Sequence, residues 1–214
     1  MQSPQPLKTK FCRSIPIPFS NNGLILPALK ESSPITTITP KKSKNKRDSI
    51  HVHRKIFTPA QCKKIMSLSD KAAQIDGFGS YTYAKQTLQC RQHRDLFASV
   101  KDQLESVMGV ASTLFDAELS YTTLCEPHIV KYDCTSKEKS KLEIHTDSSF
   151  VTAIITLSED SAYVGGGTWF ENLSETIKPK QGELILFPGK FRHKGKKISS
   201  GTRYLLVAFF KEGK

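Results

Sequence analysis

After about residue 120 the chain consists of short apolar or β-branched runs separated by Gly, Pro, Asn or Ser, and this pattern limits the folds it can adopt. Runs of this length and composition predict strands. Many short strands joined by tight turns favour a jelly-roll sandwich. The runs cover residues 124–132, 150–157, 168–170, 183–187 and 202–210.

Two helices are predicted before this strand-rich part. The first follows a short alternating strand at residues 51–57, with Thr58 as its N-cap, Pro59 at its first position and Gln61 completing a capping box. Apolar residues at three- and four-residue intervals predict the second over residues 96–108. We therefore predict an α+β, mainly β chain, a double-stranded β-helix (jelly roll, cupin-like) with N-terminal helices packed on one sheet.

The positive charge is unevenly distributed along the chain. Residues 1–55 contain eleven Lys or Arg against Glu31 and Asp48, which is +9 of the formal net charge of +12 and leaves +3 for residues 56–214. The N-terminal stretch is also rich in Pro, Ser, Thr and Lys and lacks an apolar period. We predict a disordered basic tail over residues 1–48 and a single catalytic domain over residues 49–214, with its core at 124–212.

The basic run from Lys41 to Arg47 has several possible roles. It could be a nuclear import signal, a weak phosphate-binding arm or a solvated linker. An organelle transit peptide also stays open, because no acidic residue precedes Glu31. No apolar run of membrane-spanning length and no secretory signal is visible, so we expect no membrane partner.

The cysteines indicate the redox compartment. Five are present, an odd number without a C-x-x-C pair, so neither a disulfide framework nor a structural zinc site is predicted. They are Cys12, Cys62, Cys90, Cys125 and Cys134. A reducing intracellular compartment, nucleus or cytoplasm, is the expected location.

Four residues in the last third of the chain form a spaced set. His145 and Asp147 lie two apart, and His193 follows a separate strand run that closes at a Pro-Gly pair. Two imidazoles and one carboxylate can occupy one face of an octahedral ferrous ion and leave three positions open. Arg203 opens a strongly apolar strand, where a buried guanidinium is costly unless it meets an anion. A dicarboxylic acid that chelates the metal at one end could supply that anion, which is the layout expected of a 2-oxoglutarate and iron(II) dependent oxygenase.

Four sequence elements, in the same order, resemble the catalytic domain of the prolyl 4-hydroxylase type of 2-oxoglutarate and iron(II) dependent dioxygenases. They are H-T-D-S-S-F-V-T from His145, Y-V-G-G-G-T-W-F at 163–170, P-G-x-x-x-H ending at His193, and G-T-R-Y-L-L-V at 201–207. The stretch 145–210 is especially similar to the hydroxylase domain of procollagen-lysine dioxygenases.

The resemblance implies roles for individual residues. His145, Asp147 and His193 would be the catalytic iron ligands, and Arg203 would bind the distal carboxylate of 2-oxoglutarate. Tyr132 resembles the tyrosine that hydrogen-bonds the co-substrate in this family. The implied cofactors are Fe(II), 2-oxoglutarate, O2 and ascorbate as reductant.

The chain also departs from the family pattern. The polar stretch 135–141 lengthens the gap between Tyr132 and His145, and Leu142 stands where many relatives carry a second tyrosine. A different substrate cleft is therefore expected. The remaining histidines, for which ordinary surface or core positions are predicted, are His51, His53, His93 and His128.

The resemblance implies hydroxylation of a substrate C–H bond with succinate and CO2 as co-products, and a peptidyl prolyl or lysyl residue is the expected target. A nucleic-acid hydroxylase or demethylase of the same superfamily is the alternative, with the basic tail as a possible contact. A non-catalytic jelly-roll binding module is the third reading. A protein or peptide is thus the expected partner, and nucleic acid stays possible.

Overall fold

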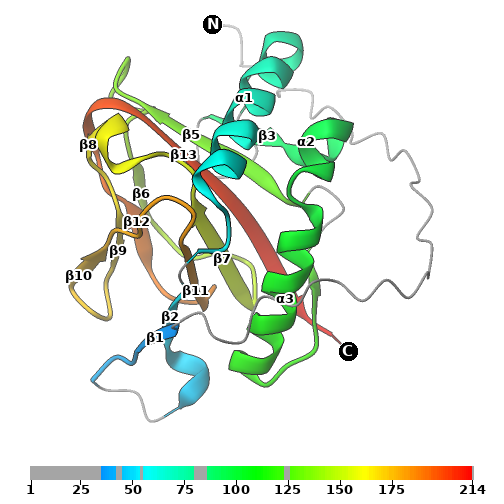
Figure 1. Cartoon of the computed structure of the whole chain (residues 1–214). Helices are drawn as coiled ribbons and strands as arrows, with labels where there is room; N and C mark the ends of the chain where they lie inside the picture. Colours follow the sequence, from blue (N-terminus) through cyan, green and yellow to red (C-terminus); the bar gives the residue numbers. More distant parts are fainter. Residues whose placement is uncertain (1–34, 42–44, 54, 80–85, 123–125, 214) are drawn as a thin grey trace, which may run out of the picture.

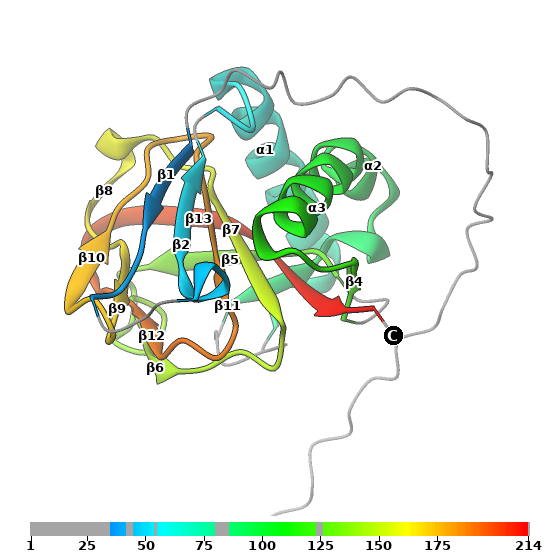
Figure 2. The same cartoon turned by 90° about the horizontal axis from the view of Figure 1, so that it is seen from below.

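The structure of the chain is a computed structural model, and it describes residues 35–41, 45–53, 55–79, 86–122 and 126–213. Two antiparallel sheets face each other on one side of the molecule, and three helices lie on the other side (Figures 1 and 2). The predicted mainly β jelly roll with helices on one sheet is confirmed. Within the described residues, no helix has the length and hydrophobicity that crossing a membrane requires.

The larger sheet has the strand order β1-β2-β11-β7-β13-β5-β3, with β4 and β8 each paired to β13. Its longest member is β13 (Ile198–Glu212), which pairs with β5, β7, β8 and β4 in turn. The other strands are β1 (Ile35–Ile38), β2 (Ile50–His53), β3 (Thr87–Gln89), β4 (Leu119–Tyr121), β5 (His128–Asp133), β7 (Val151–Thr156), β8 (Tyr163–Gly165) and β11 (Leu184–Pro188).

The smaller sheet has the order β10-β9-β12-β6. Its strands are β6 (Leu142–His145), β9 (Thr168–Phe170), β10 (Glu175–Ile177) and β12 (His193–Gly195). In this sheet β6 is the outer strand and β12 lies beside it, so the two histidine-bearing strands are neighbours.

The helices are α1 (Pro59–Asp76), α2 (Arg94–Ala98) and α3 (Lys101–Phe115). The predicted capping box of α1 is present, with the Gln61 backbone N–H donating to the Thr58 hydroxyl and the Gln61 side chain accepting from the Thr58 backbone N–H. The second predicted helix is divided at Ser99, whose hydroxyl donates to the Leu96 carbonyl oxygen at 2.7 Å and so competes with continued helical bonding.

The central strands separate two apolar clusters, because alternate residues of a strand point to opposite faces. Residues that face the helices form one core, for example Leu206 with Leu104 and Phe115 of α3. Residues that face the smaller sheet form a second cluster, for example Leu205 with Phe187. Both faces of β7 and β11 are covered, which explains why every residue of these strands is buried.

The predicted boundary of the N-terminal tail at residue 48 is wrong for the part that the structure describes. Ile35–Ile38 forms β1 and pairs with β2, which in turn pairs with β11, so the sheet extends into the predicted tail. Arg47 belongs to the basic run but forms ion pairs with Asp116 and Glu212 of the folded body. Residues 1–34 and 42–44 lie outside the described residues, so the remainder of the tail prediction falls outside the structure.

Candidate metal centre

Three of the predicted site residues meet at the open end of the β12–β6 pair. His145 is the last residue of β6, His193 is the first residue of β12, and the register of the two strands pairs them directly. Asp147 follows β6 by two residues, where its backbone N–H donates to the Gly189 carbonyl oxygen at 2.9 Å. The strand register thus supplies two ligand side chains and the loop supplies the third.

The donor atoms of His145, Asp147 and His193 all lie within 4.8 Å of one another. Nε2 of His145 is 3.5 Å from Oδ1 of Asp147, and Nε2 of His193 is 3.6 Å from Oδ2. The three side chains are only 10%, 7% and 5% exposed in chain order. Such a compact set of two imidazoles and a carboxylate could hold a six-coordinate divalent metal with three positions open.

Hydrogen bonds behind the histidines fix the tautomer of each ring. Nδ1 of His145 donates to the Glu143 carbonyl oxygen at 2.7 Å, and Nδ1 of His193 donates to the Phe191 carbonyl oxygen at 2.9 Å. A carbonyl oxygen can only accept, so the proton of each neutral ring lies on Nδ1. The lone pairs of both Nε2 atoms are therefore available on the side where Asp147 lies.

The Asp147 carboxylate and the two imidazoles influence each other's pKa values. Burial alone would lower the pKa of His145, but Asp147 and the Glu143 carbonyl oxygen raise it above the usual value, because both accept hydrogen bonds from the protonated ring. Burial lowers the pKa of His193. Burial opposes ionisation of Asp147, yet the His145 hydrogen bond and the charge of His193 hold its pKa below the usual value. The carboxylate is thus ionised near neutral pH, which suits metal binding.

The fourth predicted residue, Arg203, lies deeper in the same barrel. It is 1% exposed and pairs with Tyr132 across the β13–β5 ladder. Its guanidinium carbon lies 5.6 Å from the centroid of the Tyr132 ring and 5.9 Å from that of Tyr163. Nη1 donates to the Gly167 carbonyl oxygen at 3.3 Å, and among the described residues no carboxylate forms an ion pair with this arginine.

Unpartnered polar atoms gather around this arginine. Within the described part of the chain, Arg203 Nε, Thr156 Oγ1 and Tyr163 OH are buried without a hydrogen-bond partner. Thr156 is paired with Leu205 on the inner face of the sheet, which makes it a diagonal neighbour of Arg203. A buried guanidinium beside two unpaired hydroxyls is costly in an apolar setting. The pocket is therefore built for a ligand with anionic oxygen atoms.

Tyr132 lies between the triad and Arg203. Burial raises its pKa, and both Arg203 and Asp147 act on the hydroxyl electrostatically. A Cβ atom at position 195 would lie 2.6 Å from this hydroxyl, so Gly195 leaves the space that it occupies. Tyr132 thus contacts Arg203 through its ring and also lines the cavity beside the triad.

The sequence did not reveal several polar residues that lie near the triad and Arg203. Thr156 and Tyr163 were not identified as polar partners, because a threonine in an apolar run and a tyrosine before glycines are ordinary strand residues. His128, predicted to be ordinary, is buried, contacts Glu126 at 3.2 Å and lines the cavity. The lining residues are His128, Val130, Tyr132, Leu142, His145, Asp147, Thr152, Ile154, Thr168, His193, Gly195, Leu205, Val207 and Phe209.

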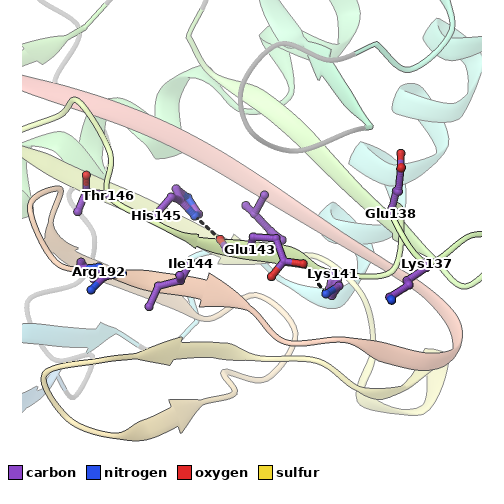
Figure 3. A pocket seen from close by; sticks show the side chains of 9 residues that line it. Lys137, Glu138, Lys141, Glu143, Ile144, His145, Thr146 and Arg192 are labelled. Atoms are coloured by element: carbon purple, nitrogen blue, oxygen red, sulfur yellow. Dashed lines mark hydrogen bonds and ion pairs between the residues drawn. The ribbon is translucent and has the colours of Figure 1, made fainter.

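An open groove of about 850 Å³ runs along the outer strand β6 and ends at His145. Figure 3 shows side chains from β6, from the loop before it and from Arg192 along this groove. Lys141 forms an ion pair with Glu143, and Arg192 Nη1 lies 2.9 Å from Glu171 Oε1. The groove gives the triad a surface on which a large substrate could lie.

No family model matches the chain. A PKHD-type hydroxylase of Synechococcus sp. (strain CC9311) is 22% identical over 175 residues, which is 74% of this chain and 76% of the relative. The viral collagen prolyl hydroxylase of Paramecium Bursaria Chlorella virus-1 has the same fold, with a TM-score of 0.55 and 14% identity over 77% of this chain and 96% of that one. An alpha-ketoglutarate dependent carbocyclase of nogalamycin biosynthesis superposes with a TM-score of 0.61 and 12% identity, over 83% of this chain and 87% of that one. The chain is therefore similar in sequence to a PKHD-type hydroxylase and shares the fold of solved 2-oxoglutarate dependent enzymes.

The residues of the site suit Fe(II) and a dicarboxylic ligand. The compact His-Asp-His set is a donor set that Fe(II) accepts, and the unpartnered polar atoms near Arg203 match a buried carboxylate. The donor set and the buried polar atoms are thus compatible with Fe(II) and with a carboxylate ligand. The low identities leave the substrate open, because one fold serves many reactions.

Proposed function

We propose that the protein is a hydroxylase in which His145, Asp147 and His193 hold Fe(II). The observation that carries this proposal is the convergence of three donor atoms within 4.8 Å in the same barrel as a buried, unpaired Arg203 Nε. Both imidazoles present Nε2 because their Nδ1 atoms are bonded to backbone carbonyls. The protein thus holds three ligands in place before the metal binds.

The arginine pocket is proposed to hold 2-oxoglutarate. Arg203 would bind the distal carboxylate, Thr156 and Tyr163 would donate their free hydroxyls to it, and Tyr132 would flank the chain of the co-substrate. When bound together, Fe(II) and 2-oxoglutarate activate O2, and succinate and CO2 are the co-products of hydroxylation. The apolar residues around the cavity, Leu205 among them, exclude water from the reacting groups.

A peptidyl prolyl or lysyl residue is the proposed target. The names of two similar proteins, a PKHD-type hydroxylase and a viral collagen prolyl hydroxylase, support a hydroxylase of this kind. The groove along β6 supports a macromolecular substrate, because it is open and ends at His145. An extended peptide could place one side chain at the triad while its flanking residues lie along the strand.

The charges of the groove do not favour a nucleic acid. Lys141 is paired with Glu143, and Arg192 is paired with Glu171, so two of its cations are already neutralised. The two other charged residues of the groove, Lys137 and Glu138, carry opposite charges. A phosphate backbone needs a stripe of uncompensated cations.

We further propose ascorbate as the reductant and a reducing compartment as the location. Cys62 and Cys90 are buried free thiols, and Cys134 is an exposed one. Free thiols at these positions suit a cytosolic or nuclear environment. An import role for the run 41–47 stays a proposal, and Arg47 at its end is already bound to the folded body.

The test is a turnover assay with ferrous iron, 2-oxoglutarate, ascorbate and arrays of proline- and lysine-containing peptides. Succinate formation and the gain of one oxygen atom in a peptide, read by mass spectrometry, are the expected results. His145→Ala should abolish both, and Arg203→Ala should weaken 2-oxoglutarate binding most. Glu175→Ala, on the exposed strand β10, serves as a matched surface control and should leave turnover unchanged.

Two results would contradict the proposal in different ways. Absence of Fe(II) binding by the wild-type protein would remove the metal site and the enzyme with it. Fe(II) and 2-oxoglutarate binding without modification of any peptide would leave the oxygenase assignment and remove the peptidyl substrate.

A further inference from the structure

Thr152 lies directly behind the Asp147 carboxylate. It occupies an inward-facing position of β7 and is 1% exposed. Its hydroxyl donates to Asp147 Oδ2 at 2.7 Å, which is a strong bond to a charged acceptor. A β-branched side chain in a strand has few accessible rotamers, so the direction of this donor is fixed.

A second hydroxyl orients the first. Ser149 Oγ and Thr152 Oγ1 lie 2.8 Å apart. Since the single Thr152 proton is directed to Asp147, the Ser149 hydroxyl must be the donor in this contact. The result is a one-way chain of hydrogen bonds from Ser149 through Thr152 to the carboxylate.

The turn before His193 holds this chain in place. A Cβ atom at position 189 would lie 2.1 Å from the Ser149 carbonyl oxygen and 2.4 Å from its hydroxyl, so only glycine fits there. Gly189 also accepts from the Asp147 backbone N–H at 2.9 Å and donates to the Phe150 carbonyl oxygen at 3.1 Å. The turn at Gly189, which leads to His193, therefore holds the loop that carries Asp147 in place.

We propose that Thr152 is a positioning residue that limits Asp147 to a single metal-ligating oxygen. The proposal rests on the proposed Fe(II) site. Oδ2 accepts the hydrogen bond of the Thr152 hydroxyl, while Oδ1 lies 3.5 Å from His145 Nε2 and is left to bind the ion. A carboxylate that turned to bind through both oxygens would occupy one of the three positions that an octahedral ion needs for the chelating acid and O2.

The test compares Thr152→Val with Thr152→Ser in the full chain, with Fe(II) under anaerobic conditions and Co(II) as a spectroscopic probe. Thr152→Val removes the hydroxyl at nearly constant volume and should weaken metal binding on the order of 10- to 100-fold. Its Co(II) visible spectrum should change, because the ligand arrangement changes. Thr152→Ser keeps the donor and should restore both readouts to near the wild-type values.

Controls separate a positioning role from a purely structural one. Thr202→Val makes the same change on β13, where Thr202 pairs with Asp133, and should bind metal as the wild type does. Ser149→Ala removes only the outer donor and should give a smaller loss than Thr152→Val. Thermal unfolding without metal should be similar for all four variants, so that any loss of metal binding is not a loss of fold.

The proposal is overturned if Thr152→Val binds Fe(II) and Co(II) as the wild type does with an unchanged spectrum. It is also overturned if Thr152→Ser fails to restore binding, or if Thr202→Val loses as much as Thr152→Val. If Thr152→Val does not fold, Ser149→Ala decides the question through the same spectrum. A wild-type protein that binds neither metal would instead refute the proposed metal site.

Discussion

The two faces of the central sheet differ in how completely they are filled. On the helix side, Leu206 packs into a cluster made of buried apolar residues from α1, α3 and the strands. On the barrel side, the neighbouring Leu205 borders a cavity together with His145 and Asp147. Both leucines are almost fully buried, at 0% and 3% exposure, so burial alone does not distinguish them.

The difference shows how one sheet serves stability and chemistry at the same time. The helix face is apolar and filled, so its packing supplies folding free energy. The barrel face carries Arg203, Thr156 and Tyr163 with polar atoms that have no partner among the described residues. Unsatisfied polar atoms destabilise the free protein, and a bound anion would compensate for them. Changes on the two faces should therefore affect different measurements.

The largest effect is expected from Asp147→Asn on the barrel face. The amide keeps the shape and can still accept from Thr152 but is a poor metal ligand, so turnover should fall more than ~1000-fold. The unfolding midpoint should stay close to that of the wild type. Succinate formation and thermal unfolding are the measurements. A large loss of stability with turnover retained would mean that Asp147 serves stability and not chemistry.

Substitution of the two neighbouring leucines compares the faces directly. Leu206→Ala should lower the free energy of unfolding by about 2–5 kcal/mol, because it leaves a cavity in a filled core. Leu205→Ala should cost less, since this side chain already borders a cavity, and should raise the KM for 2-oxoglutarate. Equilibrium denaturation measures the free energy of unfolding, and steady-state kinetics measure the KM for 2-oxoglutarate. Equal losses of stability would show that the two faces are equally packed.

Removal of an unpartnered hydroxyl should have a smaller effect. Thr156→Val deletes the buried Oγ1 atom and should weaken 2-oxoglutarate binding by about 1.5–3 kcal/mol, the loss expected for one hydrogen bond to a charged group. Stability of the protein without ligand should be unchanged or slightly higher. Calorimetric titration with 2-oxoglutarate measures the change in affinity. An unchanged affinity would mean that the Thr156 hydroxyl does not face the co-substrate.

The smallest effect is expected at Arg47, on the surface near the end of α3. Its ion pairs with Asp116 and Glu212 are partly exposed, so Arg47→Ala should cost at most about 1 kcal/mol. Added salt should reduce the difference from the wild type further. Turnover should not change, and a large loss of turnover would mean that the basic run reaches the active site.

The parts of the fold that depend on local sequence were predictable. The Thr58–Gln61 capping box defines the start of α1 because both partners lie within one helical turn. The long strands around β7 and β13 were also found, since they are apolar over many residues. The division at Ser99 was missed, because a serine hydroxyl that bonds to a preceding carbonyl leaves no periodic signal.

The parts that depend on long-range pairing were not predictable in detail. Ile35–Ile38 becomes a strand because β2 offers an edge to pair with, although its surroundings have the composition of a tail. The residue types of the metal triad were visible in the sequence, and their convergence requires the His193–His145 register. Thr156 could not be recognised, because only the structure shows that its hydroxyl lacks a partner.

The length of β13 has a consequence for how the molecule opens. Residues 205–207 of this strand are paired with β5 on one side and with β7 on the other. Arg203, two residues earlier, is therefore anchored to the segment whose backbone amides should exchange with solvent most slowly. Local fraying cannot expose such a segment, so hydrogen exchange there should occur only through global unfolding. The surroundings of Arg203 and the whole fold should consequently be lost at the same temperature.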